Sequence, residues 1–98
     1  MKIVATSLGE SLASPVDPRF GRARFFILFD FENGHWFVED NRNNVQVSEN
    51  AGIRAAEAIV NMDIAAVLTG HCGPRAFAVL SAAGVAVYQE VTGAVRDA

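Results

Sequence analysis

Apolar residues occur along the first half of the chain in short runs separated by polar and glycine-rich stretches. The runs at residues 2–7, 24–31 and 35–40 are rich in β-branched or aromatic side chains, which favour the pleated surface of a sheet. Between the last two runs, Asn33 and Gly34 tolerate positive φ, as a tight hairpin turn requires. The first half therefore predicts an opening strand followed by an antiparallel hairpin, whose first strand should be covered on both faces.

After residue 47 the spacing of the apolar residues becomes helical. In residues 48–62 Ile53, Ala56, Ile59 and Val60 fall on one stripe, away from Arg54, Glu57 and Asn61. Ser48 or Asn50 is expected to cap this helix by accepting a hydrogen bond from an amide of its first turn. Further along the chain, the pattern predicts a buried strand, a second helix with Pro74 in its first turn, and a last strand, at residues 63–69, 73–84 and 85–88.

The order of these elements predicts an α/β domain. Alternating helices and strands after residue 47 imply parallel units joined by right-handed crossovers, and the hairpin adds antiparallel strands. We expect one domain over residues 1–98, with a mixed sheet of about five strands and helices packed on it. Residues 92–98 are typical of the first turn of a third helix capped by Thr92, truncated or frayed after that turn.

Composition narrows the class of protein. The 98 residues are 51% hydrophobic and 19% charged, which fits a folded domain rather than a disordered chain. A net charge of -3 argues against a general nucleic-acid binder, and no apolar run is long enough to cross a membrane. One cysteine cannot form an internal disulfide, and no secretion signal is indicated, so the expected location is the cytoplasm.

The segment TGHCGPRAF, residues 69–77, contains the first candidate site. It joins the carboxyl end of a predicted strand to the start of a predicted helix, an edge where α/β proteins collect ligands. Gly70 and Gly73 would let the backbone approach a ligand closely, and Cys72 and His71 offer soft ligands for zinc, copper or iron–sulfur clusters. The field of the helix is expected to lower the pKa of Cys72.

A structural interpretation of the same segment stays open. Cys72 would then be a small buried residue and His71 a solvated turn residue. A closed zinc site needs about four ligands, and His35 is the only other histidine or cysteine of the chain. A preassembled cluster that carries its own sulfides, or a site shared between two chains, would need fewer ligands.

A long loop at residues 9–22 is the second candidate, because loops of this length in small domains often bind something. At its end come three closely spaced arginines that would form an anion site if their guanidinium groups converge: Arg19, Arg22 and Arg24. Alternatively, Asp17 pairs with one arginine and Phe20 anchors the loop to the core. Both interpretations hold together if the anchored loop positions its arginines.

Catalytic interpretations find little support in the sequence. The signatures of acyl transfer, nucleotide hydrolysis and dinucleotide binding are absent from the chain. Asp30, Glu39, Asp40 and Glu57 could in principle hold two metals, but Glu57 is predicted to face solvent and the other acids flank the hairpin turn. The sequence therefore favours a protein that is not an enzyme.

Read together, DPRFGRARFFILFD and NAGIRAAEAIVNMDIAAVLTGHCGPRAFAVLSAAGVAVY resemble the dinitrogenase iron-molybdenum cofactor biosynthesis family. This nitrogen-fixation-related family includes NifX-like carriers, the carboxyl-terminal part of NifB proteins and small stand-alone proteins. The resemblance implies a ribonuclease-H-like sheet of three antiparallel strands followed by alternating helices and parallel strands, without nuclease activity. It also implies binding, storage or delivery of an iron–sulfur or molybdenum-containing cluster.

Carried over onto this chain, the resemblance places the family's recurrent loops at the residues Arg19, Phe20, Gly21 and Arg22 and at the turn Gly70, Gly73 and Pro74. Arg19, Arg22 and Arg24 would neutralise the cluster, backbone amides of residues 70–73 would cradle it, and His71 and Cys72 would ligate metal. The expected partners are the cluster and cluster-assembly proteins, and the expected state is a monomer or weak homodimer. The alternative is a metal-independent module that recognises a partner protein or a small anion.

Overall fold

Five strands form one mixed sheet in the computed structural model, which describes residues 1–41 and 51–97. The spatial order is β3-β2-β1-β4-β5, with antiparallel pairing on one side of β1 and parallel pairing on the other. The strands are β1 (Lys2–Ser7), β2 (Phe25–Asp30), β3 (Trp36–Asp40), β4 (Ala66–Leu68) and β5 (Ala86–Tyr88). The predicted α/β fold, with three antiparallel strands followed by alternating helices and parallel strands, is confirmed.

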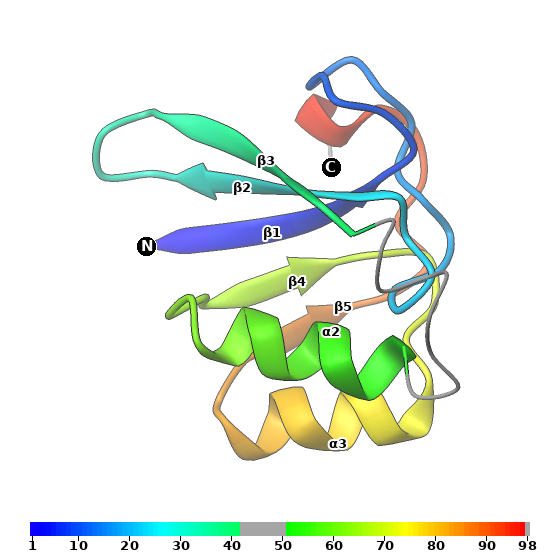
Figure 1. The fold of residues 1–98 in the computed structure, drawn as a ribbon. Coiled ribbons are helices and arrows are strands. Elements are labelled where there is room, and N and C mark those ends of the chain that lie inside the picture. The colour runs from blue at the N-terminus through cyan, green and yellow to red at the C-terminus, as the bar shows by residue number, and fades with distance from the viewer. Residues whose placement is uncertain (42–50, 98) are drawn as a thin grey trace.

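Two helices, α2 (Ala51–Val60) and α3 (Pro74–Ala82), lie side by side on one face of the sheet (Figure 1). The stripe predicted for the first helix packs inward, since Ala56 and Ile59 are buried while Arg54 and Glu57 are exposed. The proposed caps Ser48 and Asn50 lie outside the described residues. These helices therefore leave the opposite face of the sheet to other parts of the chain.

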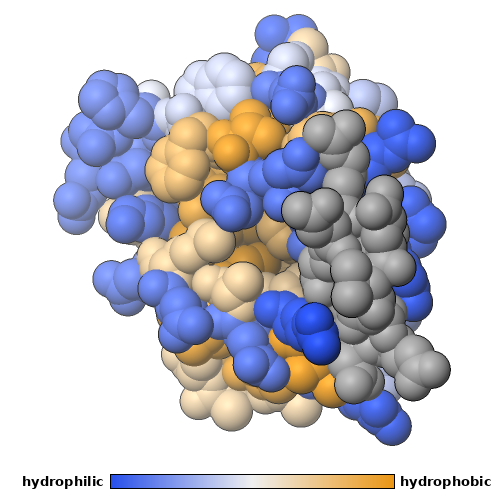
Figure 2. Space-filling model, viewed as in Figure 1, coloured by the Kyte–Doolittle hydropathy of each residue, from blue (hydrophilic) through white to orange (hydrophobic). Residues whose placement is uncertain are grey.

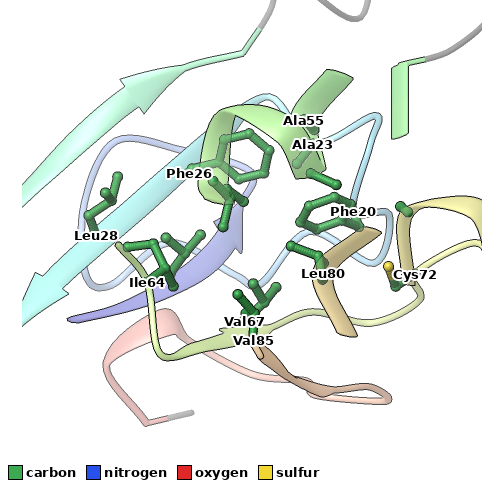
Figure 3. Packing of buried hydrophobic residues seen from close by; sticks show 14 residues of the cluster. Phe20, Ala23, Phe26, Leu28, Ala55, Ile64, Val67, Cys72, Leu80 and Val85 are labelled. Atoms are coloured by element: carbon green, nitrogen blue, oxygen red, sulfur yellow. The ribbon is translucent and has the colours of Figure 1, made fainter. Parts of the chain in front are cut away.

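The main core fills the space between the sheet and the two helices. Val4 of β1 pairs with Leu28 of β2 and with Val67 of β4, so these three side chains share the face that the helices cover. Phe20 and Leu80 are almost completely buried in the same cluster, as Figure 3 shows. Phe20 comes from the long loop, so the loop contributes to the core.

A smaller cluster covers part of the other face. Ala5 and Ile27 are paired across β1 and β2, and they pack with Val16 and Val95. Because β2 contributes to both clusters, the expectation that this strand is covered on both faces is confirmed. The surface in view in Figure 2 also carries hydrophobic side chains over the hairpin strands, among hydrophilic neighbours.

Several local expectations are corrected by the structure. Of the two hairpin turn residues, only Gly34 has positive φ. Asp63, at φ 59, ends the turn after α2, so β4 begins later than predicted. The last described element is a 3-10 turn, η1 (Val95–Asp97), which begins after Gly93 rather than at Thr92. Within the described residues no helix is long and apolar enough to cross a membrane.

Replacing Phe20 with Ala should destabilise the protein by about 3–5 kcal/mol, because a large side chain that is 1% exposed leaves a cavity in the core. The matched change Phe77→Ala removes the same ring from a side chain that is 41% exposed, and should cost no more than about 1 kcal/mol. Urea unfolding of the two variants measures both values. Equal losses would contradict the anchoring role of Phe20.

Candidate functional site

The candidate site lies where β4 ends and α3 begins. Gly73 precedes the first helical residue, Pro74, and has φ -63 and ψ 159, an extended conformation from which the helix starts. No side chain caps this end, and no acidic residue lies in the first turn. The first amides of the helix therefore present a partial positive charge that no residue of that turn neutralises.

The loop that carries Arg19, Arg22 and Arg24, here called the arginine loop, lies directly against this junction. The amide of Phe20 donates to the carbonyl oxygen of His71 at 2.9 Å, and Arg19 and His71 form an isolated parallel β-bridge. Figure 1 shows the two segments together at the end of the sheet toward which β4 and β5 point. The two candidate segments, about fifty positions apart in the sequence, thus flank one end of the sheet.

The backbone of Gly70 makes this approach possible. A Cβ atom at residue 70 would lie 2.5 Å from the Cα and 2.8 Å from the carbonyl oxygen of Pro18. A Cβ atom at Gly73 would meet nothing within 4 Å. Of the two predicted glycines, Gly70 is therefore required by contact with the protein itself, whereas Gly73 leaves open space beside the helix start.

The buried side chain of Asp17 holds the arginine loop by hydrogen bonds to its backbone. Its side chain is fully buried, and its carboxylate accepts hydrogen bonds from the amides of Arg19 at 3.0 Å and of Arg24 at 3.3 Å. The Arg19 Nε also lies 3.5 Å from the same carboxylate. The interpretation in which Asp17 pairs with one arginine is confirmed. The sequence did not reveal that Asp17 also accepts hydrogen bonds from two backbone amides of the loop.

Two buried threonines link β1 and the end of β4 to the arginine loop. Thr6 Oγ1 lies 2.7 Å from the carbonyl oxygen of Asp17 and 2.9 Å from Thr69 Oγ1. Because a hydroxyl has one proton, Thr6 donates to the carbonyl and accepts the proton of Thr69. This link between β1, the loop and the end of β4 was not predicted, since threonines in strands usually signal only β propensity.

The three arginines differ in how the structure holds them. Arg19 is 59% exposed and is paired with the turn through the backbone bridge. Arg22 and Arg24 are exposed further along the loop. The backbone of Arg24 is fixed on both sides, because its carbonyl accepts from the amide of Asn41 at 2.9 Å while its amide donates to Asp17.

His71 and Cys72 have opposite environments. The side chain of His71 is exposed, whereas Cys72 is 4% exposed and belongs to the main core cluster, at the edge where α3 begins (Figure 3). Burial raises the pKa of the Cys72 thiol above its ordinary value. The expectation that the helix field lowers this pKa was therefore wrong, because removal of the thiolate from water has the larger effect.

The segment after β5 completes the support of the turn. Gln89 Oε1 accepts a hydrogen bond from the amide of Cys72 at 2.9 Å, and the amide of Glu90 donates to the carbonyl oxygen of Gly70 at 2.7 Å. Glu90 has φ 62, a conformation that non-glycine residues rarely adopt. No sequence motif pointed to these two residues.

The described side chains do not form a ready-made metal site. Within residues 1–41 and 51–97 no three His, Cys, Asp or Glu side chains are grouped so as to hold a metal ion. What the arrangement offers is an exposed basic loop, an exposed imidazole and a helix start at one edge. This combination suits an anion better than a bare cation.

Gly70→Ala should destabilise the protein by about 1–3 kcal/mol, because the new methyl group would overlap the backbone of Pro18. Gly73→Ala in the same turn should change the stability by less than about 1 kcal/mol, since its φ and ψ suit alanine and the space is open. Chemical denaturation of both variants checks the difference. A larger loss at Gly73 would show that the close approach is not the constraint.

The pKa of Cys72 can be measured directly, because the chain has one cysteine. Burial predicts that the ¹³Cβ resonance of Cys72 in the folded protein titrates above the ordinary thiol value of about 8.5. The same resonance in the urea-unfolded chain should titrate near that value and serves as the control. Titration of the folded protein below the unfolded chain would instead support a thiolate stabilised by the helix.

Comparison with known proteins identifies the family. The orange protein from Desulfovibrio gigas, in its apo form, is 38% identical, with a TM-score of 0.92 over 98% of this chain and 81% of that one. A putative NifB protein from Thermotoga is 31% identical, with a TM-score of 0.83 over the same shares. An uncharacterised protein of Methanocaldococcus jannaschii is 29% identical over 88% of this chain and 79% of its own length. The model of the dinitrogenase iron-molybdenum cofactor family matches residues 1–98, and the chain belongs to that family.

Proposed function

We propose that this protein binds an anionic iron–sulfur or molybdenum-containing cluster and stores or delivers it without catalysing a reaction. The observation that carries the proposal is the backbone bridge between Arg19 and His71, which holds the arginine loop against the turn of residues 70–73. The class of cargo is supported by membership of the dinitrogenase iron-molybdenum cofactor family. The orange protein has an apo form, as a protein that carries a removable group would.

Charge favours an anionic cargo at this edge. The chain has a net charge of -3, yet the exposed residues Arg19, Arg22 and Arg24 place three cations within six positions of one loop. The carboxylate of Asp17 offsets part of this charge, but it is fully buried and already accepts hydrogen bonds from the loop. The three arginines are exposed, so their guanidinium groups can meet a cluster in solution.

His71 and Cys72 would contribute to different extents. The imidazole of His71 is exposed on the turn and available as a ligand without rearrangement. The thiol of Cys72 is buried, and this burial raises its pKa, so it would ligate only after the turn moves and the proton leaves. A cluster that brings its own sulfides needs few protein ligands, so arginines and amides of residues 70–73 would supply most of the binding, with the amide of Cys72 already donated to Gln89 Oε1.

One alternative has specific support. Since the described residues contain no group of three metal-ligating side chains and the thiol is buried, a small anion or an acidic partner protein would also suit the basic loop. In that case the same arginines would act without metal. The two functions differ in their response to chelators.

Anaerobic incubation with iron, sulfide and molybdate should yield protein-bound metal and charge-transfer absorption. Arg19→Gln should weaken binding about tenfold, the loss expected for one charge-assisted hydrogen bond of about 1.5 kcal/mol. Arg96→Gln provides a matched control, because Arg96 belongs to η1 outside the arginine loop and the glycine turn. Bound metal is measured by elemental analysis after gel filtration.

Two further variants separate ligation from charge. Loss of bound metal in His71→Ala or Cys72→Ala would assign that side chain as a ligand, whereas unchanged binding would leave the arginines and amides as the binding groups. Absence of any bound metal in the unmodified protein would contradict cluster carriage. Chelator-insensitive binding of molybdate alone, lost in the Arg19→Gln, Arg22→Gln double variant, would support the alternative.

A further inference from the structure

The strand β3 forms one edge of the sheet. It pairs with β2 on one side, and in the described part of the chain no strand lies along its other side. An edge strand presents a row of backbone N–H and C=O groups that can pair with a strand of another chain. The edge of β3 is therefore a candidate interaction surface.

Two hydrogen bonds show which backbone groups of β3 face outward. The amide of Asn41 donates to the carbonyl oxygen of Arg24, and the carbonyl oxygen of His35 accepts from the last residue of β2, both at 2.9 Å. Along an antiparallel pair such bonds recur at every second residue. The backbone groups of Trp36 and Val38 therefore point away from β2, toward the edge.

The helix side of this edge carries an apolar and an acidic side chain. Phe37 pairs with Leu28 of the main core, so Phe37 and, two positions later, Glu39 lie on the helix face. Both line one groove with Met62, which follows α2, and Figure 2 shows hydrophobic side chains between β3 and α2. Phe37 is 53% exposed, so much of its ring meets water at the edge.

We infer that β3 pairs with β3 of a second copy of this chain, antiparallel, with Phe37 opposite Phe37 of the partner subunit. The outward backbone groups of Trp36 then bond to those of Val38 of the partner subunit, and the reverse, as a two-fold interface requires. Phe37 falls in a pair without hydrogen bonds, where the Cα atoms are about 4.5 Å apart and the side chains are closest. Aromatic pairs at such positions stabilise a sheet.

Charge complementarity favours this register over its neighbours. It places the exposed His35 opposite Glu39 of the partner subunit, and the symmetry repeats the pair. Among residues 1–41 and 51–97 neither side chain belongs to an ion pair. A two-fold axis at Val38 would instead set Glu39 opposite Phe37 of the partner subunit. An axis at Glu39 would set two carboxylates opposite each other, which is unfavourable.

The inferred dimer leaves each arginine loop outside the interface. The loop leads into β2, whose first residue, Phe25, pairs with Asp40 at the end of β3. Because the axis lies near the start of β3 and the two strands run antiparallel, these ends point in opposite directions. Each copy therefore keeps its own loop, and the dimer and the proposed function can fail independently.

Sedimentation equilibrium of the full chain should show a dimer that forms as the protein concentration rises. Phe37→Lys should weaken the association at least about tenfold, because it sets two ammonium groups opposite each other. Phe77→Lys is the matched control, since Phe77 is 41% exposed on α3, away from β3. A chain that stays monomeric, or a dimer that Phe37→Lys leaves unchanged, would overturn the inference.

Exchanging the two charged partners tests their pairing. His35→Glu should weaken the dimer about tenfold, because it sets two carboxylates opposite each other. Adding Glu39→His to that variant should restore the association, since the symmetry again pairs an imidazole with a carboxylate. If the double variant stays as weak as the single one, the assigned register is wrong.

Cross-linking tests the register directly. Phe37→Cys places two thiols opposite each other at a Cα separation inside the disulfide range of about 4.4–6.8 Å, so mild oxidation should give covalent dimers. Val38→Cys should cross-link much less, because its neighbour across the interface is Trp36 of the partner subunit. Cys72 is 4% exposed, so the unmodified chain should not cross-link. Stronger cross-linking of Val38→Cys, or a monomer whose β3 binds an unrelated extended peptide instead, would overturn the inference.

Discussion

The close approach of Gly70 to Pro18 is the constraint on which the site depends. With no side chain at residue 70, the turn after β4 lies against the loop backbone, and the bridge between Arg19 and His71 forms beside it. Phe20, the next loop residue, enters the core from this contact. The same backbone contact therefore orders the basic loop, orients the start of α3 and adds a large side chain to the core.

The buried polar groups under the site serve this contact. Asp17 accepts from two loop amides, and Thr6 connects the Asp17 carbonyl to Thr69 at the end of β4. Full burial would make each of these groups costly if it lacked a partner, and in the described residues every such side-chain atom has one. These hydrogen bonds hold the loop that carries the exposed arginines.

Cys72 illustrates how two physical effects compete at one residue. From the sequence it lies at the start of a helix, where the dipole favours a thiolate, and that position was read correctly. Packing in the core then decides the outcome, because desolvation opposes the charged form and raises the pKa of the thiol. Cys72 is buried in a cluster that includes Phe20, and Phe20 belongs to a loop that is far away in the sequence.

Local patterns by themselves determined the strands, both helices, the hairpin and the positions of the candidate segments. They did so because periodicity, turn residues and Pro74 act over a few neighbouring positions. The motifs of the chain also indicated its family. Folding in three dimensions is needed to see that Gly70 rather than Gly73 is sterically required and that Gln89 and Glu90 support the turn. These facts arise from contacts between distant segments, whose distances no local pattern of residues encodes.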